Sequence, residues 1–406
     1  MKKRNLLTED ATGIALRSDM QIVIPDDATV LCRRSAGRLA QALTQNGLEP
    51  AIVTGQDATA RQTVRMILGN GGMTYRVTVD GAGNCNLTAG CDRALQQAVL
   101  ELCGKVKNGR LPQISTAEGS AENLLRVMYY NVYGYGNLDS IPDRLGQQAA
   151  LIADAAPDVL CVQEFDRLHR GSAKALLEQA GYTEVPVTED GGFLYPAGKN
   201  CEAIFYRADR LELLRSGGEP YPDRVEVDGV EVIGNNSNTK STAWAVFRER
   251  AGGRSFLVVN THFMWSAPEL TRAQANAVRV DNAKRTVALI DAIRELDPAY
   301  ASLPVIFGGD LNCGADSDPC AVLKAALTPV YDMVDAERDN IGYYGVYATY
   351  DETTGQYHYG EIPREGGGID HVFAAGLTVR NYLTDTGFRA RITSDHLPKT
   401  VDLILN

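Results

Sequence analysis

The sequence has no apolar stretch that approaches the ~20 residues needed to span a bilayer. It begins with basic residues at positions 2–4, but the chain turns polar at Thr8 before any apolar run of signal-peptide length appears. Because both a membrane segment and a secretion signal are lacking, we expect a cytoplasmic protein that does not insert into membranes.

Paired cysteines are lacking as well. The eight cysteines are scattered along the chain and include no CxxC pair. Cys161 lies inside an apolar run, which is typical of a reduced thiol in a protein core. This cysteine usage agrees with the expected cytoplasmic location.

Basic charge is scarce, since 40 Lys and Arg residues stand against 51 Asp and Glu residues and give a formal net charge of −11. A protein that grips duplex nucleic acid over a broad surface needs clustered basic side chains. The basic residues of one expected long helix are interpreted as a charged helix surface: Arg272, Arg279, Lys284 and Arg285. Nucleic acid is therefore a less favoured partner, although a local patch or a bound cation can still hold one phosphate.

The length of 406 residues exceeds what one ordinary core contains, so we expect two domains. Residues 1–105 alternate strand and helix patterns and predict a small α/β accessory domain. Residues 106–121 are rich in Lys, Gly, Ser, Pro and Glu without periodicity and predict a linker. Residues 122–406 form the second expected domain, which contains every candidate site residue.

The N-terminal segment has no concentration of His or carboxylate residues that would indicate a site. Its strands and closing helix include the segments Ile67-Leu68-Gly69, Tyr75-Arg76-Val77, Asn86-Leu87-Thr88-Ala89-Gly90, Ala94-Leu95 and Ala98-Val99-Leu100. The order of these segments resembles the non-catalytic α/β domain that precedes the barrel in several bacterial glycoside hydrolases. A generic α/β accessory domain explains the same pattern, and both interpretations stay open.

From residue 124 onward, short apolar runs recur with the length that is typical of buried strands. The runs are Leu124 to Tyr130, Val159 to Val162, Ala203 to Tyr206, Phe256 to Val259, Leu303 to Phe307 and Ile369 to Ala374. A long helix is expected between two of them, with Ser266 as its N-cap and an end near Leu296. Strands with a few long helices predict two sheets packed face to face and flanked by helices.

The polar residues of interest stand at the ends of these runs. The segments are Asn131, Gln163-Glu164, Asn260-Thr261-His262, Gly309-Asp310-Leu311-Asn312, Ile369-Asp370-His371 and Ser394-Asp395-His396-Leu397-Pro398. Each segment alone has a simple explanation as a cap or a turn. Six of them at strand ends predict a functional site at one edge of the sheets, where a ligand would meet them.

These segments, in this order, resemble the signature series of the endonuclease/exonuclease/phosphatase superfamily, the DNase I-like metal-dependent phosphoesterases. The resemblance covers roughly residues 122–406. It implies an α/β fold, a four-layered α/β sandwich of two packed β-sheets flanked by helices, which follows the small accessory domain. It also implies a metal-dependent hydrolase of phosphoester bonds, of the phosphodiesterase, phosphatase or nuclease type.

The resemblance implies a Mg²⁺ or Mn²⁺ ion at the mouth of the sandwich. Glu164 is the main candidate ligand, with Asn131 and Asp395 as neighbours that bind directly or through water. The charges agree, because Glu164, Asp310, Asp370 and Asp395 would not all ionise close together without a cation or His partners. Oxygen ligands of this kind suit the hard cation Mg²⁺.

By the same resemblance, the catalytic residues are His262, Asp310, Asn312, Asp370 and His396. Asp370 is expected to orient His396 and to stabilise its protonated ring. His262 is expected to bind the phosphate and to protonate the leaving oxygen, while Asn312 faces the same phosphate. Asp310 and His396 both remain candidates for the general base that activates water.

Substrate choice is expected to depend on loops rather than on the metal site. Residues 216–242 and 338–368 predict two long loops, and tyrosines of the second either stack on a base or sugar ring or simply pack the loop onto the sandwich. We expect a small phosphodiester or phosphomonoester substrate, with nucleic acid or a phosphosugar behind it, and no obligate protein partner. The alternative is a non-catalytic, carbohydrate-associated or scaffold protein that uses the fold for binding.

Overall fold

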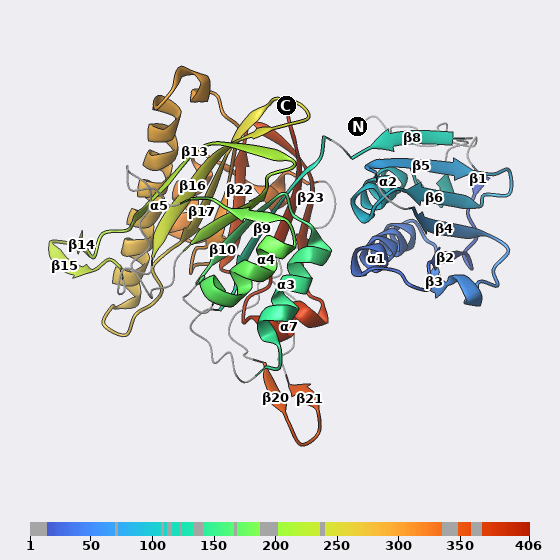
Figure 1. The fold of residues 1–406 in the computed structure, drawn as a ribbon, viewed down its shortest axis with the longest axis horizontal. Helices are drawn as coiled ribbons and strands as arrows, with labels where there is room; N and C mark the ends of the chain where they lie inside the picture. The colour runs from blue at the N-terminus through green and yellow to red at the C-terminus, as the bar shows by residue number, and fades with distance from the viewer. Residues whose placement is uncertain are drawn as a thin grey trace, which may run out of the picture. The chain divides into compact units, whose positions relative to one another are not determined.

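A computed structural model of the chain describes residues 14–69, 72–106, 109–111, 116–121, 123–133, 141–165, 169–186, 202–235, 240–334, 348–358 and 368–406. The chain divides into two compact units, Met1–Asn123 and Leu124–Asn406, which we call the N-terminal and the C-terminal unit. Both are mixed α/β structures (Figure 1). None of the helices in the described ranges is long and apolar enough to cross a membrane.

The N-terminal unit is built around a six-stranded sheet with the strand order β3-β2-β4-β6-β5-β8. Its strands are β2 (Gln21–Ile24), β3 (Ala51–Thr54), β4 (Thr63–Leu68), β5 (Thr74–Val79), β6 (Cys85–Ala89) and β8 (Thr116–Ser120). A short ladder joins β1 (Ile14–Ala15) to β7 (Arg110–Leu111). The helices α1 (Val30–Gln45) and α2 (Asp92–Lys105) contact each other and the sheet, as a small α/β unit requires.

The segment predicted as a linker, residues 106–121, contributes an edge strand to this sheet. β8 pairs antiparallel with β5, which places Tyr75 opposite Gly119. The Tyr75 ring lies directly over Gly119, a position where a Cβ atom would approach within 2.3 Å of that ring. An edge strand has one unpaired side and needs little apolar surface, so Thr116–Ser120 shows no apolar periodicity. The pairing corrects the linker prediction for these residues.

The C-terminal unit contains two six-stranded sheets. The first, in the order β11-β12-β10-β9-β24-β23, comprises β9 (Leu125–Asn131), β10 (Val159–Gln163), β11 (Tyr182–Glu184), β12 (Ala203–Arg207), β23 (Leu377–Thr384) and β24 (Lys399–Leu405). The second, in the order β13-β16-β17-β18-β22-β19, comprises β13 (Leu211–Pro220), β16 (Ser241–Glu249), β17 (Ser255–His262), β18 (Val305–Asp310), β19 (Thr328–Pro329) and β22 (Asp370–Ala375). Each of the six apolar runs predicted as strands overlaps one of these strands.

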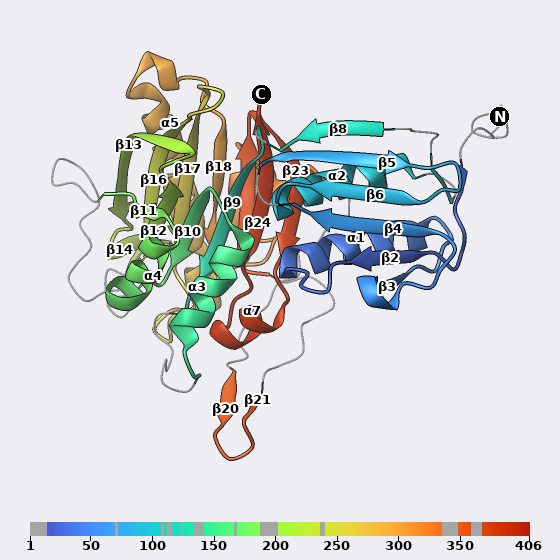
Figure 2. The same ribbon diagram turned by 45° about the vertical axis from the view of Figure 1, so that its right-hand side comes forward.

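Alternating side chains of β9 show how the first sheet separates two cores. Val127 and Tyr129 belong to the core between the two sheets, together with Ile306 of the second sheet. Met128 and Tyr130 belong to the core between the first sheet and its helices. The helices on that side are α3 (Arg144–Ala155), α4 (Lys174–Gln179) and α7 (Phe388–Thr393), and they lie along the outer face of the sheet (Figure 2).

The second sheet is covered on its outer face by α5 (Arg272–Glu295) and α6 (Asp318–Lys324). Ile290 and Ile293 of α5 pack against the buried strand residues Leu257 and Phe307. The layers therefore follow the order helix, sheet, sheet, helix. This is the predicted four-layered α/β sandwich, and the prediction of the fold class is confirmed.

The long helix begins later than the sequence indicated. Ser266 was the expected N-cap, but the observed cap is Thr271, whose side chain accepts a hydrogen bond from the backbone N–H of Gln274. The Gln274 side chain in turn accepts from the backbone N–H of Thr271, which completes a capping box. Two N–H groups at the start of the helix are thereby satisfied at Thr271.

The two predicted loops contain regular structure. Within residues 216–242, β13 continues to Pro220 and a hairpin follows, formed by β14 (Arg224–Val227) and β15 (Val230–Ile233). For these described residues, the pairing corrects the expectation of a long loop. Within residues 338–368, only the hairpin of β20 (Thr349–Asp351) and β21 (Gln356–His358) is described, and Tyr343, Tyr344, Tyr347 and Tyr359 lie outside the described residues. Tyr357 packs its ring at 5.3 Å from Phe388, which favours the packing interpretation for this tyrosine.

Candidate active site

Strand pairing gathers the selected polar residues at one end of each sheet. β9 and β10 run parallel, so their carboxyl ends place Asn131 and Glu164 side by side. β17 and β18 also run parallel, with His262 opposite Asp310. β22 runs antiparallel to β18 and starts with Asp370 opposite Asp310. Residues far apart in the sequence therefore meet because each stands at the end of a buried strand.

Asp395 and His396 join this group from the turn between α7 and β24. The hydroxyl of Ser394 donates a hydrogen bond of 2.7 Å to the carbonyl oxygen of Asn131, at the end of β9. The same hydroxyl oxygen accepts a bond of 3.1 Å from the backbone N–H of His396. The turn is thereby fixed to the strand that carries Asn131.

Asp310 occupies the centre of the site and is almost fully buried. Its Oδ2 atom lies 3.2 Å from Nε2 of His262, accepts a hydrogen bond of 3.1 Å from Nδ2 of Asn131, and lies 3.7 Å from Nε2 of His396. Its Oδ1 atom accepts a bond of 2.9 Å from the backbone N–H of Asn312. Burial alone would raise the pKa of Asp310, but the neighbouring His262 and His396 outweigh burial and lower it below the usual value.

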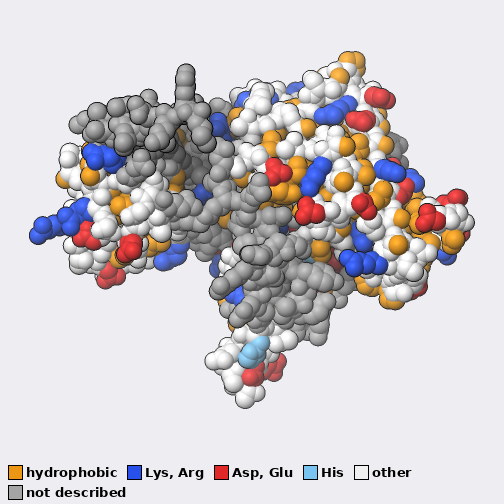
Figure 3. All heavy atoms as spheres, turned by 180° about the vertical axis from the view of Figure 1, so that it is seen from behind, with side chains coloured by type: hydrophobic (Ala, Val, Ile, Leu, Met, Phe, Trp, Pro, Cys, Tyr) orange, Lys and Arg blue, Asp and Glu red, His pale blue; other side chains and the backbone are white. Residues whose placement is uncertain are grey.

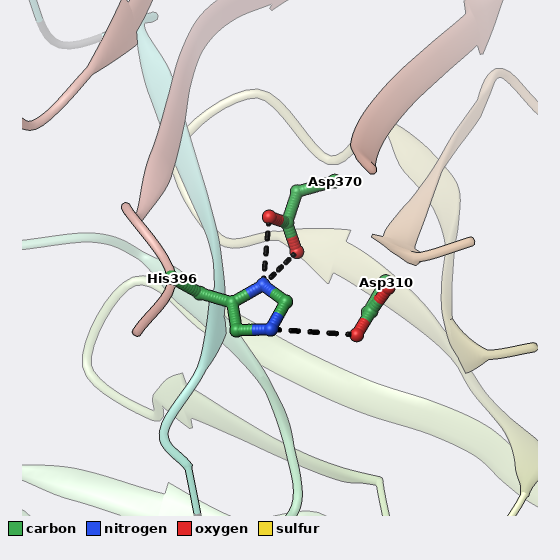
Figure 4. Close-up of side chains that lie close together, drawn as sticks. All are labelled: Asp310, Asp370 and His396. Carbon is green, nitrogen blue, oxygen red and sulfur yellow. Dashed lines mark hydrogen bonds and ion pairs between the residues drawn. The ribbon is translucent and has the colours of Figure 1, made fainter. Parts of the chain in front are cut away.

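Asp370 and His396 form a close pair (Figure 4). The His396 Nδ1 atom lies 2.9 Å from one carboxylate oxygen of Asp370 and 3.1 Å from the other. Burial by itself lowers the pKa of His396, but the negative charges of Asp370 and Asp310 outweigh it and raise the pKa well above the usual value. His396 is therefore a protonated ring whose Nε2 side points toward Asp310 (Figure 4).

His262 is in the opposite state. Burial lowers its pKa, and the positive charge of Lys240 lowers it further, against the opposing effect of Asp310. The Lys240 ammonium lies 2.6 Å from Nε2 and 3.2 Å from Nδ1 of the ring. Glu202 is fully buried, which raises its pKa well above the usual value, and it places a carboxyl oxygen 3.7 Å from Nδ1. His262 is therefore a neutral ring held among Lys240, Glu202 and Asp310.

Sequence reasoning missed both Lys240 and Glu202. Each is buried and stands directly before a strand, Glu202 before β12 and Lys240 before β16. Asp370 was selected for the same kind of position, at the start of a strand. The rule that polar residues at strand ends gather at the site would have found all three if it had been applied to residues before a run as well as after it.

Arg279 was interpreted as part of a charged helix surface, but its side chain is buried beneath the loop that follows β17. Its guanidinium donates to the carbonyl oxygen of Met264 at 3.3 Å. One helical turn further, the side chain of Asn282 accepts from the backbone N–H of Met264 at 3.0 Å. These contacts tie the segment after His262 to α5, so Arg279 supports the site rather than the solvent-facing side of the helix.

Two asparagines selected from the sequence are hydrogen-bonded within the site. The Oδ1 atom of Asn131 accepts from the backbone N–H of Tyr133 at 2.9 Å, and its Nδ2 atom donates to Asp310 and, at 3.3 Å, to the candidate ligand Glu164. The Nδ2 atom of Asn312 donates to the carbonyl oxygen of Phe263 at 3.0 Å. Within the described residues, both act as hydrogen-bond donors that brace the site.

Glu164 and Asp395 have the features of cation ligands. Oε2 of Glu164 and Oδ1 of Asp395 are buried and have no hydrogen-bond partner among the described residues. Glu164 also adopts a positive φ of 58°, a strained conformation that often marks a functional position. Burial, together with the negative charges of Glu164 and Asp310, raises the pKa of Asp395 to about 6, although His396 opposes the shift. Two carboxylates of this kind fit a hard divalent cation, which would bind the oxygens that lack a hydrogen-bond partner.

The ligating atoms of a second group, Asp310, Asp370 and His396, lie within 4.8 Å of one another and are all buried. These atoms face each other through the contacts already described, so the group is held together by hydrogen bonding and ion pairing. Protonated His396 offers no lone pair to a metal. The oxygen atoms of Glu164 and Asp395 are therefore the better match to a divalent cation.

The sequence model of the endonuclease/exonuclease/phosphatase family matches residues 128–396 of the chain. Among solved structures, the chain is similar to a family protein from Bacteroides vulgatus, with 23% identity, a TM-score of 0.49, and coverage of 70% of this chain and 99% of that one. It is similar to a mannosyl-6-phosphatase from Bacteroides thetaiotaomicron, with 21% identity, a TM-score of 0.47, and coverage of 69% and 100%. It is also similar to the human nocturnin catalytic domain, with 19% identity, a TM-score of 0.46, and coverage of 70% and 95%.

A comparison with curated protein sequences finds no match. The family match spans about two thirds of the chain and includes the strand ends from β9 to the turn before β24. The chain therefore belongs to the endonuclease/exonuclease/phosphatase family, whose members hydrolyse phosphoester bonds.

Proposed function

We propose that this chain hydrolyses a phosphoester bond with the help of a divalent cation, Mg²⁺ or Mn²⁺. The observation that carries the proposal is the buried Asp310 carboxylate, which lies between a neutral histidine, His262, and a protonated histidine, His396. Pairs of titratable groups with opposite pKa shifts are typical of acid–base sites. A protein that only bound a ligand would have no chemical need to bury so much charge.

The protonated His396 ring binds the phosphate group of the substrate through a hydrogen bond. Asp370 fixes the ring through Nδ1, which leaves the Nε2–H group on the side of Asp310. There it donates to a phosphoryl oxygen and offsets the negative charge that develops in the transition state. A cation held by Glu164 and Asp395 would polarise the phosphoryl oxygens when bound.

Asp310 is the better candidate for the group that accepts a proton from water. His396 is already protonated and cannot accept one, whereas Asp310 is ionised. Its low pKa makes it a weak base, so its main contribution is to orient the attacking water and to take its proton late in the reaction. The neutral His262 ring places its Nε2 atom 3.2 Å from Oδ2 of Asp310 and therefore orients this carboxylate. We do not assign His262 to protonation of the leaving group.

The favoured substrate is a small phosphodiester or phosphomonoester. Among the described residues on the face shown in Figure 3, acidic and basic side chains are interspersed and form no broad basic patch. The net charge of −11 agrees with this, since extended nucleic acid needs a wide stretch of Lys and Arg. A short substrate requires only the local cationic groups of the site.

The test compares the wild-type chain with His396→Ala on a panel of phosphoesters in Mg²⁺, Mn²⁺ and EDTA. The panel holds bis-p-nitrophenyl phosphate, p-nitrophenyl phosphate, single- and double-stranded DNA, RNA and sphingomyelin. His358→Ala is the matched control, because His358 is exposed on the β20–β21 hairpin. Thermal unfolding of each variant separates a loss of chemistry from a loss of structure.

We expect turnover that requires a divalent cation and that falls by ~10²-fold or more in His396→Ala but not in His358→Ala. The preferred member of the panel identifies the substrate class. Equal activity of the folded His396→Ala variant would refute the role of His396. If the wild-type chain turned over no member with any cation, the alternative of a non-catalytic carbohydrate-associated or scaffold protein would be favoured.

A further inference from the structure

Lys240 is a buried cation whose position is fixed by its backbone. The side chain of Asn235 accepts from the backbone N–H of Lys240 at 3.0 Å and donates to its carbonyl oxygen at 2.9 Å. The backbone N–H of Tyr221 donates to the same carbonyl oxygen at 3.0 Å. Lys240 thus enters the sheet at a defined point, directly before β16, which pairs with the strand that carries His262.

From this point the ammonium group reaches the His262 ring. The ammonium lies 2.6 Å from Nε2 and 3.2 Å from Nδ1 of the ring, while Oδ2 of Asp310 lies 3.2 Å from Nε2. A protonated ring would place a second positive charge directly against the ammonium, so this contact favours a neutral ring. Lys240 therefore influences the protonation state of His262 and limits where the ring can lie.

The ammonium also lies in the field of the site carboxylates. Burial lowers the pKa of Lys240, and the negative charges of Glu164 and Asp310 act in the opposite direction. Removing an ammonium from water is about as unfavourable as an excellent set of partners is favourable, so a protein with an apolar side chain of similar size is often equally stable. Stability alone gives no reason for a lysine at this position.

We propose that Lys240 is a positioning residue of the catalytic site, a resident cation that holds His262 beside Asp310 and offsets the charge of Glu164, one of the two carboxylates that would receive the divalent cation. Its single charge takes up part of the negative charge of the site. The resident cation therefore lowers the affinity for the divalent ion while it maintains the arrangement that the reaction uses. The proposal rests on the proposed function for the part that concerns catalysis, but not for the part that concerns cation binding.

The experiment uses the full-length chain with two variants at this position, Lys240→Met and Lys240→Arg. Met has a similar length and no charge, whereas Arg keeps the charge with a larger head group. Lys174→Met is the matched control, because Lys174 is a partly exposed lysine on α4 outside the site. Three quantities are measured: Mn²⁺ binding to the chelator-treated protein by electron paramagnetic resonance, thermal unfolding in EDTA, and kcat and KM on the best phosphoester of the panel.

For Lys240→Met we expect Mn²⁺ to bind roughly 10-fold more tightly, because a nearby positive charge has been removed from a partly shielded site. The same variant loses kcat by ~10²-fold with KM nearly unchanged, since an oriented catalytic arrangement is lost rather than substrate binding. Its melting temperature does not fall. Lys240→Arg binds Mn²⁺ as the wild type does, and Lys174→Met is unchanged in all three measurements.

If Lys240 only supported the fold, its exchange would change Mn²⁺ affinity and melting temperature in a different direction. Weaker Mn²⁺ binding together with a lower melting temperature in Lys240→Met would overturn the proposal, and so would failure of both Lys240 variants to fold. Unchanged Mn²⁺ affinity in the folded Lys240→Met variant would also overturn it. Because Mn²⁺ binding needs no substrate, this result stands even if the chain hydrolyses no phosphoester, and the two proposals fail separately.

Discussion

The exchange Asp395→Asn should stabilise the metal-free protein while it disables the site. Asp395 is 8% exposed, its Oδ1 atom has no hydrogen-bond partner among the described residues, and its pKa is raised from 3.8 to about 6. A shift of about two units corresponds to about 3 kcal/mol at a pH well above both values. Asn has the same shape without the charge, so the exchange removes this destabilisation.

The sign of the pH dependence follows from the direction of the shift. The folded state binds the Asp395 proton more tightly than the unfolded state, so the wild type loses stability as the pH rises from about 4 to about 7. The variant lacks this loss. The difference in unfolding free energy between Asp395→Asn and wild type should therefore be small near pH 4 and reach about 3 kcal/mol near pH 8, or roughly 5–10 °C in melting temperature.

The assay is urea or thermal unfolding in EDTA, followed by tryptophan fluorescence. Both tryptophans of the chain, Trp244 and Trp265, belong to the C-terminal unit, so the signal reports on the unit that contains the site. A saturating divalent cation should stabilise the wild type and not the variant, because a ligand stabilises only the state that binds it. A variant that is less stable than the wild type at pH 8 in EDTA, or a difference that does not grow with pH, would refute the reasoning.

Two further exchanges separate the chemistry of the site from the support of the fold. Asp370→Asn removes the negative charge that holds His396 protonated. We therefore expect kcat to fall by ~10²-fold or more and the alkaline limb of the pH–rate profile to move to lower pH. An alkaline limb that did not move would contradict the pairing of Asp370 with His396. Arg126→Ala breaks a fully buried bidentate pair with Asp402, at 2.6 and 3.0 Å, and should destabilise the C-terminal unit by about 3–5 kcal/mol in the same fluorescence assay, with kcat of the folded fraction retained.

Much of the fold was accessible from the sequence because the strands of the C-terminal unit are buried on both faces. Such strands appear as short continuous apolar runs, and β9, β10 and β18 stand out in this way. Their ends were visible as well, since a polar residue that follows a buried run is conspicuous. The gathering of these polar residues at the strand ends therefore followed from the pattern.

Other features depend on contacts that leave no periodic signal. β8 is an edge strand in which Gly119 accommodates the ring of Tyr75. No apolar run in the sequence indicates this strand. The start of α5 depends on the reciprocal bonds of Thr271 and Gln274, which compete with the equally plausible cap at Ser266. Arg279 has the composition of a surface residue, but its burial is determined by the carbonyl oxygen of Met264, fifteen positions earlier in the chain.

The choice of the general base shows most clearly where the sequence reaches its limit. His262 ends a strand and His396 lies in the turn before one, and both contact the same oxygen of Asp310. Their protonation states differ because of what lies behind each ring: Asp370, 26 residues away in the chain, behind His396, and Lys240, 22 residues away, behind His262. An anion behind a ring retains its proton and a cation expels it. The proposal that Asp310 is the proton acceptor therefore depends on two residues distant in the sequence, Asp370 and Lys240. Only Asp370 belongs to one of the sequence motifs.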